Sequence, residues 1–213
     1  MKTKDFKSKV TGVEDKGIVE IQVSAFGNID SYGDVMTEKA FNKTIKDGFK
    51  RVKHLKDHSW NLLLGLPLEM EATKDGLRVV SKMNLEKELA RETFSDYKFF
   101  AEEGRTLEHS IGYKEIKTEK GEQSGEEVLF LKEVQLFEYS TLNFMGANEK
   151  TPLLGIKSEL ETIELMIQKG NFSDEKYKLL LEKYNELKTL LTDPQPQSVE
   201  DKPKPNFIFN LIS

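Results

Sequence analysis

Three histidines, His54, His58 and His109, are the only imidazoles in a chain that has no cysteine. Nucleophilic or acid–base chemistry near neutral pH would therefore most readily use a histidine, whose ordinary pKa is about 6.5. The lack of cysteine also excludes a disulfide framework, a thiol nucleophile, thiolate zinc sites and iron–sulfur clusters.

His54 and His58 are four residues apart, and on a helix this spacing would give a metal-binding pair. The flanking sequence RVKHLKDHSW has no helical stripe and lacks the glutamate of an HExxH motif. In a strand, residues four apart share a face but are separated by about 13 Å. We therefore expect no metal site and no cofactor, and surface or structural histidines are the plain alternative.

Ser110 and Glu138 are the other candidates for chemistry. Ser110 lies in LEHSIGYKEI (107–116), a predicted strand, where Gly112 leaves room for another backbone to approach. Most strand serines are simply packed or solvated. In VQLFEYSTLNF (134–144), Glu138 and Ser140 interrupt an otherwise apolar face of period 2. A buried carboxylate needs a partner, so Glu138 either pairs with a lysine or arginine, or orients an imidazole.

The elements that position these residues form a mixed α+β core. The hydrophobic pattern predicts a half-buried strand over 17–27 and turn chemistry over 28–34. It predicts one helix that Thr37 caps and Gly48 ends, and another over about 86–103 that Gly104 closes. The remaining predicted strands are 51–58, 62–70, 76–83, 107–118 and 126–144, with a loop, EKGEQSGEE, before the last. The sequence has no repeated βαβ pattern, which would have indicated a parallel sheet.

Composition changes outside this core. The first 16 residues form a charged, aperiodic arm, and amphipathic stretches on either side of Gly170-Asn171 predict a helical hairpin over 156–192. Beyond Asp193 the sequence PQPQSVEDKPKP reads as an extended linker. The chain closes with NFIFNLIS, which is either a short docking peptide or a final strand that folds back onto the core.

Length and charge limit the classes of function. The chain has 213 residues, enough for one domain with an extension or two small domains. Its 32 basic and 37 acidic residues give a net charge of −5, which argues against a broad nucleic-acid or anionic-membrane surface, although a local basic patch is compatible with it. The N-terminus lacks the apolar stretch of a secretory signal, and no window approaches 18 consecutive apolar residues, so we expect an intracellular protein without a membrane partner.

Five segments in this order resemble the prohead maturation proteases of tailed bacteriophages, relatives in fold of the herpesvirus assemblins. They are AFGNIDSYGDVMTEKAF (25–41), LKDHSWNLLLG (55–65), DGLRVVSKM (75–83), EEGRTLEHSIGY (102–113) and LFEYSTLNFMGAN (136–148). The resemblance covers about residues 17–150. It implies a mixed or antiparallel β-barrel core flanked by helices, followed here by the C-terminal helical hairpin.

The resemblance also implies roles for particular residues. His58 matches the family's general base, Ser110 its nucleophile, and Glu138 the acidic residue of its E-V-S-L motif. His109 is the alternative third member, because the assemblins use a second histidine. This sequence departs from the family at Tyr139, where a small β-branched residue is usual. It departs again at Phe144-Met145-Gly146, which replaces a proline-rich stretch.

The function that follows from this resemblance is a serine endopeptidase that needs no cofactor. It would cleave the scaffolding part of the major capsid protein, and itself, inside the assembling prohead in the host cytoplasm. Residues 1–16 would be a cleavable arm, 17–155 the protease domain, 156–192 a scaffolding or dimerising element, and 193–213 a linker with an apolar terminal peptide that recruits the enzyme. Two alternatives stay open: a non-catalytic capsid assembly factor with a protease-like fold, and a hydrolase of small esters.

Overall fold

The computed structural model describes residues 16–157, 159–169 and 174–192. The chain divides into two compact units, Met1–Gly170 and Asn171–Ser213. The predicted linker and apolar terminal peptide lie outside the described residues. So does the predicted arm, except for its last residue, Lys16.

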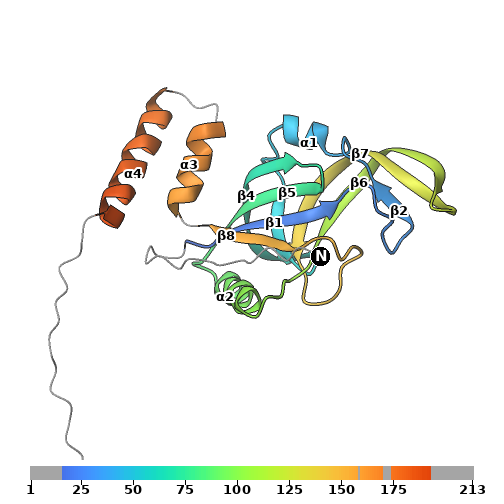
Figure 1. Ribbon diagram of the computed structural model, residues 1–213, viewed down its shortest axis with the longest axis horizontal. Helices are drawn as coiled ribbons and strands as arrows, with labels where there is room; N and C mark the ends of the chain where they lie inside the picture. The colour runs from blue at the N-terminus through green and yellow to red at the C-terminus, as the bar shows by residue number, and fades with distance from the viewer. Residues whose placement is uncertain (1–15, 158, 170–173, 193–213) are drawn as a thin grey trace, which may run out of the picture. The chain divides into compact units, whose positions relative to one another are not determined.

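One mixed sheet makes up most of the first unit (Figure 1). Its hydrogen-bonded order is β2-β7-β3-β4-β5-β1-β8, and β6 pairs with β7. The strands are β1 (Ile18–Ala25), β2 (Asp34–Met36), β3 (Lys53–Lys56), β4 (Ser59–Ala72), β5 (Gly76–Met83), β6 (His109–Gln123), β7 (Glu126–Thr141) and β8 (Leu153–Lys157). The helices are α1 (Asn42–Lys46), α2 (Glu88–Glu102), α3 (Glu159–Lys169) and, in the second unit, α4 (Asp174–Thr192).

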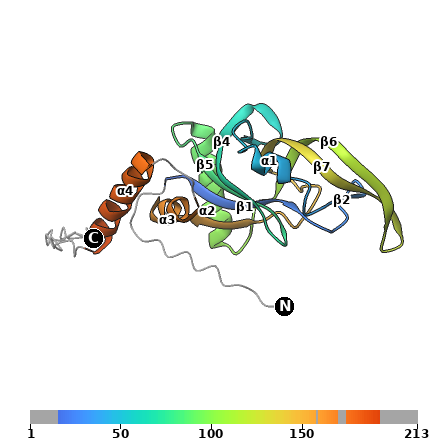
Figure 2. The ribbon, with the colours of Figure 1, turned by 90° about the horizontal axis from the view of Figure 1, so that it is seen from above.

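The α+β class is confirmed, and the sheet is mixed because β2 and β3 both run parallel to β7 while the other strand pairs are antiparallel. Within the described strands the hydrogen-bonded order is open, so a closed barrel is not confirmed. Figures 1 and 2 show the far part of the β6–β7 hairpin extending away from the rest of the sheet.

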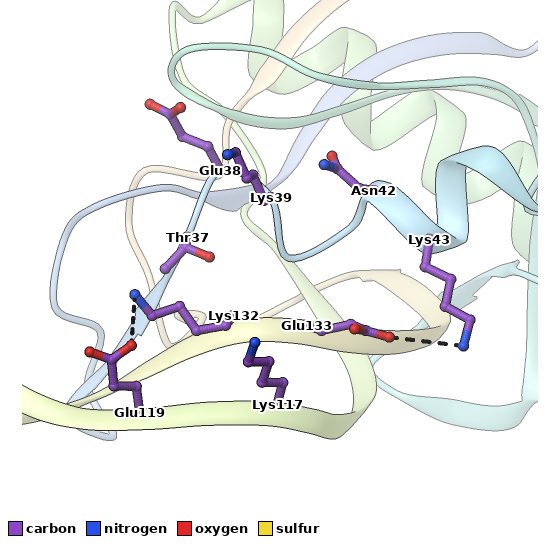
Figure 3. Close-up of a pocket in the computed structure, with 9 residues that line it drawn as sticks. All are labelled: Thr37, Glu38, Lys39, Asn42, Lys43, Lys117, Glu119, Lys132 and Glu133. Carbon is purple, nitrogen blue, oxygen red and sulfur yellow. Dashed lines mark ion pairs between the residues drawn. The ribbon is translucent and has the colours of Figure 1, made fainter.

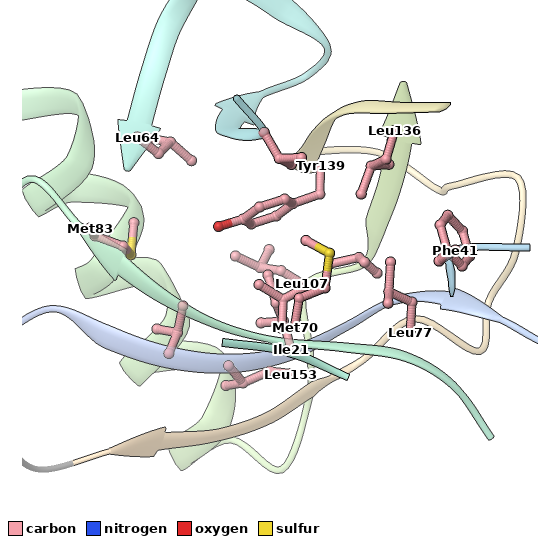
Figure 4. Close-up of a cluster of buried hydrophobic side chains, with 14 of the residues drawn as sticks. Ile21, Phe41, Leu64, Met70, Leu77, Met83, Leu107, Leu136, Tyr139 and Leu153 are labelled. Atoms are coloured by element: carbon pink, nitrogen blue, oxygen red, sulfur yellow. The ribbon is translucent and has the colours of Figure 1, made fainter. Parts of the chain in front are cut away.

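The core lies where β1, β4, β5 and β7 meet α1 and α2. Figure 4 shows its large side chains, among them Ile21, Phe41, Leu77 and Tyr139, gathered against the strands of the sheet. Helix α2 occupies the range expected from the sequence, buries Ala90, Thr93, Phe94 and Tyr97, and is followed by Gly104 at φ 66°. A left-handed residue at this place is a common helix stop.

Strand β1 is buried on both faces, which corrects the expectation of a half-buried strand. Gln22 and Ser24, expected to face water, are buried. The Gln22 Nε2 donates to the carbonyl oxygen of Lys150 at 2.7 Å, so the segment after β7 covers the polar face of β1. Glu20 on the same face is paired with Arg78 of β5, which also pairs with Glu69 and Glu71 of β4.

Three boundaries differ from the sequence-based expectation. Helix α1 begins only at Asn42, because the Thr37 hydroxyl donates to the carbonyl oxygen of Leu131 and does not cap a helix. The expected loop over 119–127 is mostly strand, since β6 and β7 continue to a two-residue turn at Ser124-Gly125 with φ 57° and 84°. Ile156 was expected in a helix, but it lies in β8 and pairs with Val19 of β1.

Helices α3 and α4 lie in the range where two helices were expected, and their packing as a hairpin stays a prediction. None of the helices in the described part of the chain is long and apolar enough to cross a membrane.

Candidate active site

Strand pairing between β6 and β7 places the candidate nucleophile and the candidate acid on one face of the sheet. Ser110 lies opposite Ser140, and Gly112 opposite Glu138. Directly opposed residues of antiparallel strands point to the same face, and alternate residues along a strand share it. Ser110, Glu138 and Ser140 therefore face the same way, whereas His109 and Thr141 face the other side of the sheet.

His58 reaches this face from the turn between β3 and β4. Strand β3 runs parallel to β7, with Leu55 opposite Ser140, and so carries the turn to the end of β7. The His58 Nδ1 lies 2.8 Å from Glu138 Oε1. Glu138 is thus paired with an imidazole, the second of the two partners considered from the sequence.

The turn itself corrects the prediction that residues 51–58 form one strand. Asp57 and His58 have φ 48° and 57°, the pattern of a two-residue type I′ hairpin turn. The left-handed region costs roughly 1–2 kcal/mol for each residue that is not glycine. The reversal also separates the two histidines: His54 remains in β3, buried on the other face, and His58 lies beyond the strand.

Both oxygens of the Glu138 carboxylate have donors. Besides the contact with His58, Oε2 accepts from the Ser140 hydroxyl at 2.6 Å, and the side chain is only 3% exposed. The hydrogen bond to Glu138 raises the pKa of His58; burial acts in the opposite direction, and the charges of Glu138 and Asp57 add to the increase. With Nδ1–H directed to the carboxylate, Nε2 is the nitrogen left to act as a base.

Gly112 makes room for the Glu138 carboxylate. A Cβ atom at this position would lie 3.0 Å from both Cγ and Cδ of Glu138, and closer still to Oε1. The space that the sequence suggested for an approaching backbone is occupied by this side chain. Gly112 therefore contributes to the site through its missing side chain.

Ser110 is half-buried on the same face as Glu138, opposite Ser140. Among the described residues, no hydrogen bond joins Ser110 to His58. Ser110 also lines a cavity of about 80 Å³. Its other walls are residues of β6, of the segment 23–36 and of the segment 147–151, and they include Tyr32, Asp34 and Tyr113. Hydrogen bonds of catalytic groups are often long in the absence of substrate, so the shared face is the informative observation.

The other two histidines belong to a buried hydrogen-bonded chain on the opposite face. The His109 Nδ1 lies 2.6 Å from the Thr151 carbonyl oxygen, and its Nε2 lies 2.6 Å from the Tyr97 hydroxyl. Tyr97 contacts the Thr141 hydroxyl, which contacts His54 Nε2. The His54 Nδ1 in turn contacts Ser81, to which Tyr139 donates.

One carbonyl fixes the direction of this whole chain. Because the Thr151 carbonyl can only accept, His109 carries its proton on Nδ1 and accepts from Tyr97. Tyr97 then accepts from Thr141, and Thr141 from His54 Nε2–H. Both histidines are neutral in this arrangement, and burial lowers the pKa of His54 well below its ordinary value and that of His109 to about 4. The structure therefore joins Glu138, and not His109, to His58.

The family model described as caudovirus prohead serine protease matches residues 4–166. The chain belongs to this family. Membership in the prohead serine protease family indicates a serine peptidase and agrees with the resemblance carried by the five sequence segments. No curated protein matches the chain. Tyr139, a departure from the family's usual small residue, is a buried core residue whose hydroxyl donates to Ser81 at 2.8 Å.

A second hollow on this member of the family, of about 760 Å³, lies between α1 and the β6–β7 hairpin (Figure 3). Lysines and glutamates make up most of its lining. The Lys43–Glu133 ion pair joins α1 to β7, and the Lys132–Glu119 ion pair joins β7 to β6 on the hairpin itself. The hollow is larger than the cavity beside Ser110, but none of the three candidate catalytic residues lines it. Among the described residues, no group of three or more histidine, aspartate or glutamate side chains is placed to hold a metal ion.

Proposed function

We propose that this protein is a serine endopeptidase in which Ser110 is the nucleophile, His58 the general base and Glu138 the residue that orients His58. The pairing of His58 with Glu138, on the face of the sheet to which Ser110 also points, is the observation that carries the proposal. This is the arrangement that activates a serine hydroxyl, which is a weak nucleophile by itself.

The reaction follows from the positions of the protons. The Ser110 oxygen attacks the carbonyl carbon of the peptide bond while His58 Nε2 takes the hydroxyl proton, and the imidazolium then gives this proton to the leaving amine. Water repeats these steps on the acyl intermediate and regenerates the serine. Throughout, Glu138 holds Nδ1–H and stabilises the charged imidazole.

The developing oxyanion needs a hydrogen-bond donor, and the phase of the β6–β7 ladder favours Ile111 over Gly112. The Leu142 amide donates to the Glu108 carbonyl, whereas the His109 amide points away from β7 to Thr151. Because donors alternate along an antiparallel pair, the Ile111 N–H also points away from β7, and the Gly112 N–H points toward it. Ile111 is therefore the amide left for a substrate.

The natural substrate that we infer is the scaffolding part of the major capsid protein, together with the protease itself. The family's description supports a role in the prohead, and we place the activity inside the assembling particle in the host cytoplasm. No cofactor, nucleic acid or membrane takes part in the proposed reaction. The termini, which are charged at one end and rich in proline at the other, are the segments that we expect to be cut.

Intact mass spectrometry of the wild type and the Ser110→Ala variant, expressed side by side in bacteria, tests the proposal. Clipping of the wild type alone is the expected result, and the fragment masses give the cleavage sites. If both remain whole, co-expression with the capsid protein repeats the comparison on the proposed substrate. Equal clipping of both, with no cleavage of the capsid protein, would favour the non-catalytic assembly factor.

A further inference from the structure

The turn that carries His58 is held in place by the last residues of β7. Asp57 and His58 both have a positive φ without being glycine, so the conformation requires support from neighbouring groups. That support comes from Ser140, Thr141 and Asn143, which lie two to five residues after Glu138 in the chain. The same short segment therefore supplies the carboxylate that pairs with His58 and the contacts that hold its backbone.

Ser140 connects these two tasks through one hydroxyl group. Its side chain is completely buried, and its Oγ lies 2.6 Å from Glu138 Oε2 and 3.1 Å from the backbone nitrogen of His58. Because the His58 N–H can only donate, the hydroxyl accepts there and directs its own proton to the carboxylate. Both partners are satisfied together, and the distance between the His58 backbone and the Glu138 carboxylate is set by a single oxygen.

A second set of contacts holds the other residue of the turn. The Asn143 backbone amide donates to Asp57 Oδ1 at 2.8 Å, and its side-chain amide donates to Oδ2 at 2.9 Å. The Asp57 backbone amide donates to the Thr141 carbonyl at 3.0 Å. We name the paired Asp57 and Asn143 side chains the clasp. The clasp is exposed, so it can be removed without opening the core.

We propose that Ser140 and the clasp are positioning residues, which fix the His58 turn in the one conformation that pairs Nδ1 with Glu138 and leaves Nε2 for Ser110. This inference rests on the proposed function. The plain alternative is that Ser140 only fills a small space in a crowded sheet, and that the clasp is an ordinary surface contact.

The test compares Ser140→Ala and Asn143→Ala with a matched control, Ser81→Ala. Ser81 is also a completely buried strand serine with hydrogen bonds to its hydroxyl, but it lies among the network residues around His54. The first readout is the rate at which a fluorophosphonate probe labels Ser110, which requires no natural substrate. The second is the pKa of His58, measured by NMR in the Ser110→Ala background, where no self-cleavage can occur.

We expect Ser140→Ala to lower the labelling rate roughly 10- to 100-fold, in the range of a lost positioning contact. It should also move the pKa of His58 down toward that of a free histidine, since the released turn loosens the contact with Glu138. Asn143→Ala should act in the same direction with a smaller effect. Ser140→Thr, which keeps a hydroxyl, should label faster than Ser140→Ala. Ser81→Ala should lower the thermal midpoint while labelling within about twofold of wild type.

An unchanged labelling rate and an unchanged His58 pKa in Ser140→Ala would overturn the role of Ser140. If that variant does not fold, the exposed Asn143→Ala variant decides: unchanged values there would overturn the positioning role. Equal labelling of the wild type and Ser110→Ala would contradict the proposed function instead. The NMR measurement would still report on the turn in that case, so the two failures are distinguishable.

Discussion

Replacing Gly112 with alanine should disable the site while leaving most of the sheet intact. The new methyl group would lie 3.0 Å from Cγ and Cδ of Glu138 and closer to Oε1, well inside van der Waals contact. The strand backbone at Gly112 is held by its pairing with β7, so the carboxylate must move, by about 1 Å for Oε1. That motion breaks the geometry of the contact with His58, the contact with Ser140, or both.

The expected size of the effect follows from this displacement. A 1 Å misplacement of a catalytic group can lower a rate about 100-fold, and overpacking a buried position costs about 1–3 kcal/mol of stability. We therefore expect the fluorophosphonate labelling rate of Gly112→Ala to fall about 100-fold. Its thermal midpoint should fall by roughly 2–4 °C for each kcal/mol lost. The activity loss should thus be far larger than unfolding at the assay temperature explains.

Gly155→Ala is the matched control, because a Cβ there meets nothing within 4 Å and Gly155 also lies in a strand. It should label at the wild-type rate. A folded Gly112→Ala protein that labels as fast as the wild type would refute the reasoning, since the Glu138 carboxylate could not then occupy the space above Gly112 and orient His58.

Three further predictions concern charge. Because Glu138 raises the pKa of His58, the labelling rate should fall in acid with a midpoint above about pH 6.5. In Glu138→Gln, this midpoint and the labelling rate on the high-pH plateau should both drop. A wild-type midpoint below the pKa of free histidine would contradict the assignment. His54 and His109 are neutral when buried but take up protons in the unfolded chain. The free energy of unfolding should therefore decrease as pH falls from about 6.5 toward 4, by up to about 1.4 kcal/mol per pH unit for each histidine. Urea unfolding at stepped pH measures this, and a free energy of unfolding that does not change with pH would count against it. Arg78→Met removes the guanidinium that pairs with Glu20, Glu69 and Glu71, and we expect it to cost about 3 kcal/mol. Urea unfolding measures this loss, and an unchanged midpoint would show that these ion pairs contribute no net stability.

The residues that the sequence brought forward were those whose signal is local. Period-2 alternation placed Glu138 and Ser140 on one face of a strand, and the cost of a buried carboxylate required a partner for Glu138. The alternation does not extend to Leu136, because the register of β7 shifts between Leu136 and Glu138 and turns Leu136 to the other face. Glycine at position 112 signalled a close approach, although the approaching group is a side chain. These inferences need only the chain within a few residues of each position.

The parts that the sequence did not predict depend on non-local contacts. The turn at Asp57-His58 contains no glycine, and it takes a left-handed conformation because the end of β7 holds it there. The parallel pairing of β3 with β7 joins segments some 80 residues apart, as the spacing of His58 and Glu138 illustrates. The role of Ser140 follows only once this pairing is known, since its partner on the turn is a backbone amide.

The two faces of β7 divide the histidines by function, and this division has a measurable consequence. On one face, Tyr139 and Thr141 belong to the chain of hydrogen bonds whose direction the Thr151 carbonyl fixes, and there His54 and His109 remain neutral. On the other face, Glu138 favours the charged form of His58. The pKa values are thus moved in opposite directions, so in the range where His58 titrates the other two histidines do not. The acid limb of the labelling profile should therefore fit a single proton with unit slope. A steeper limb would mean that the buried network titrates together with the site.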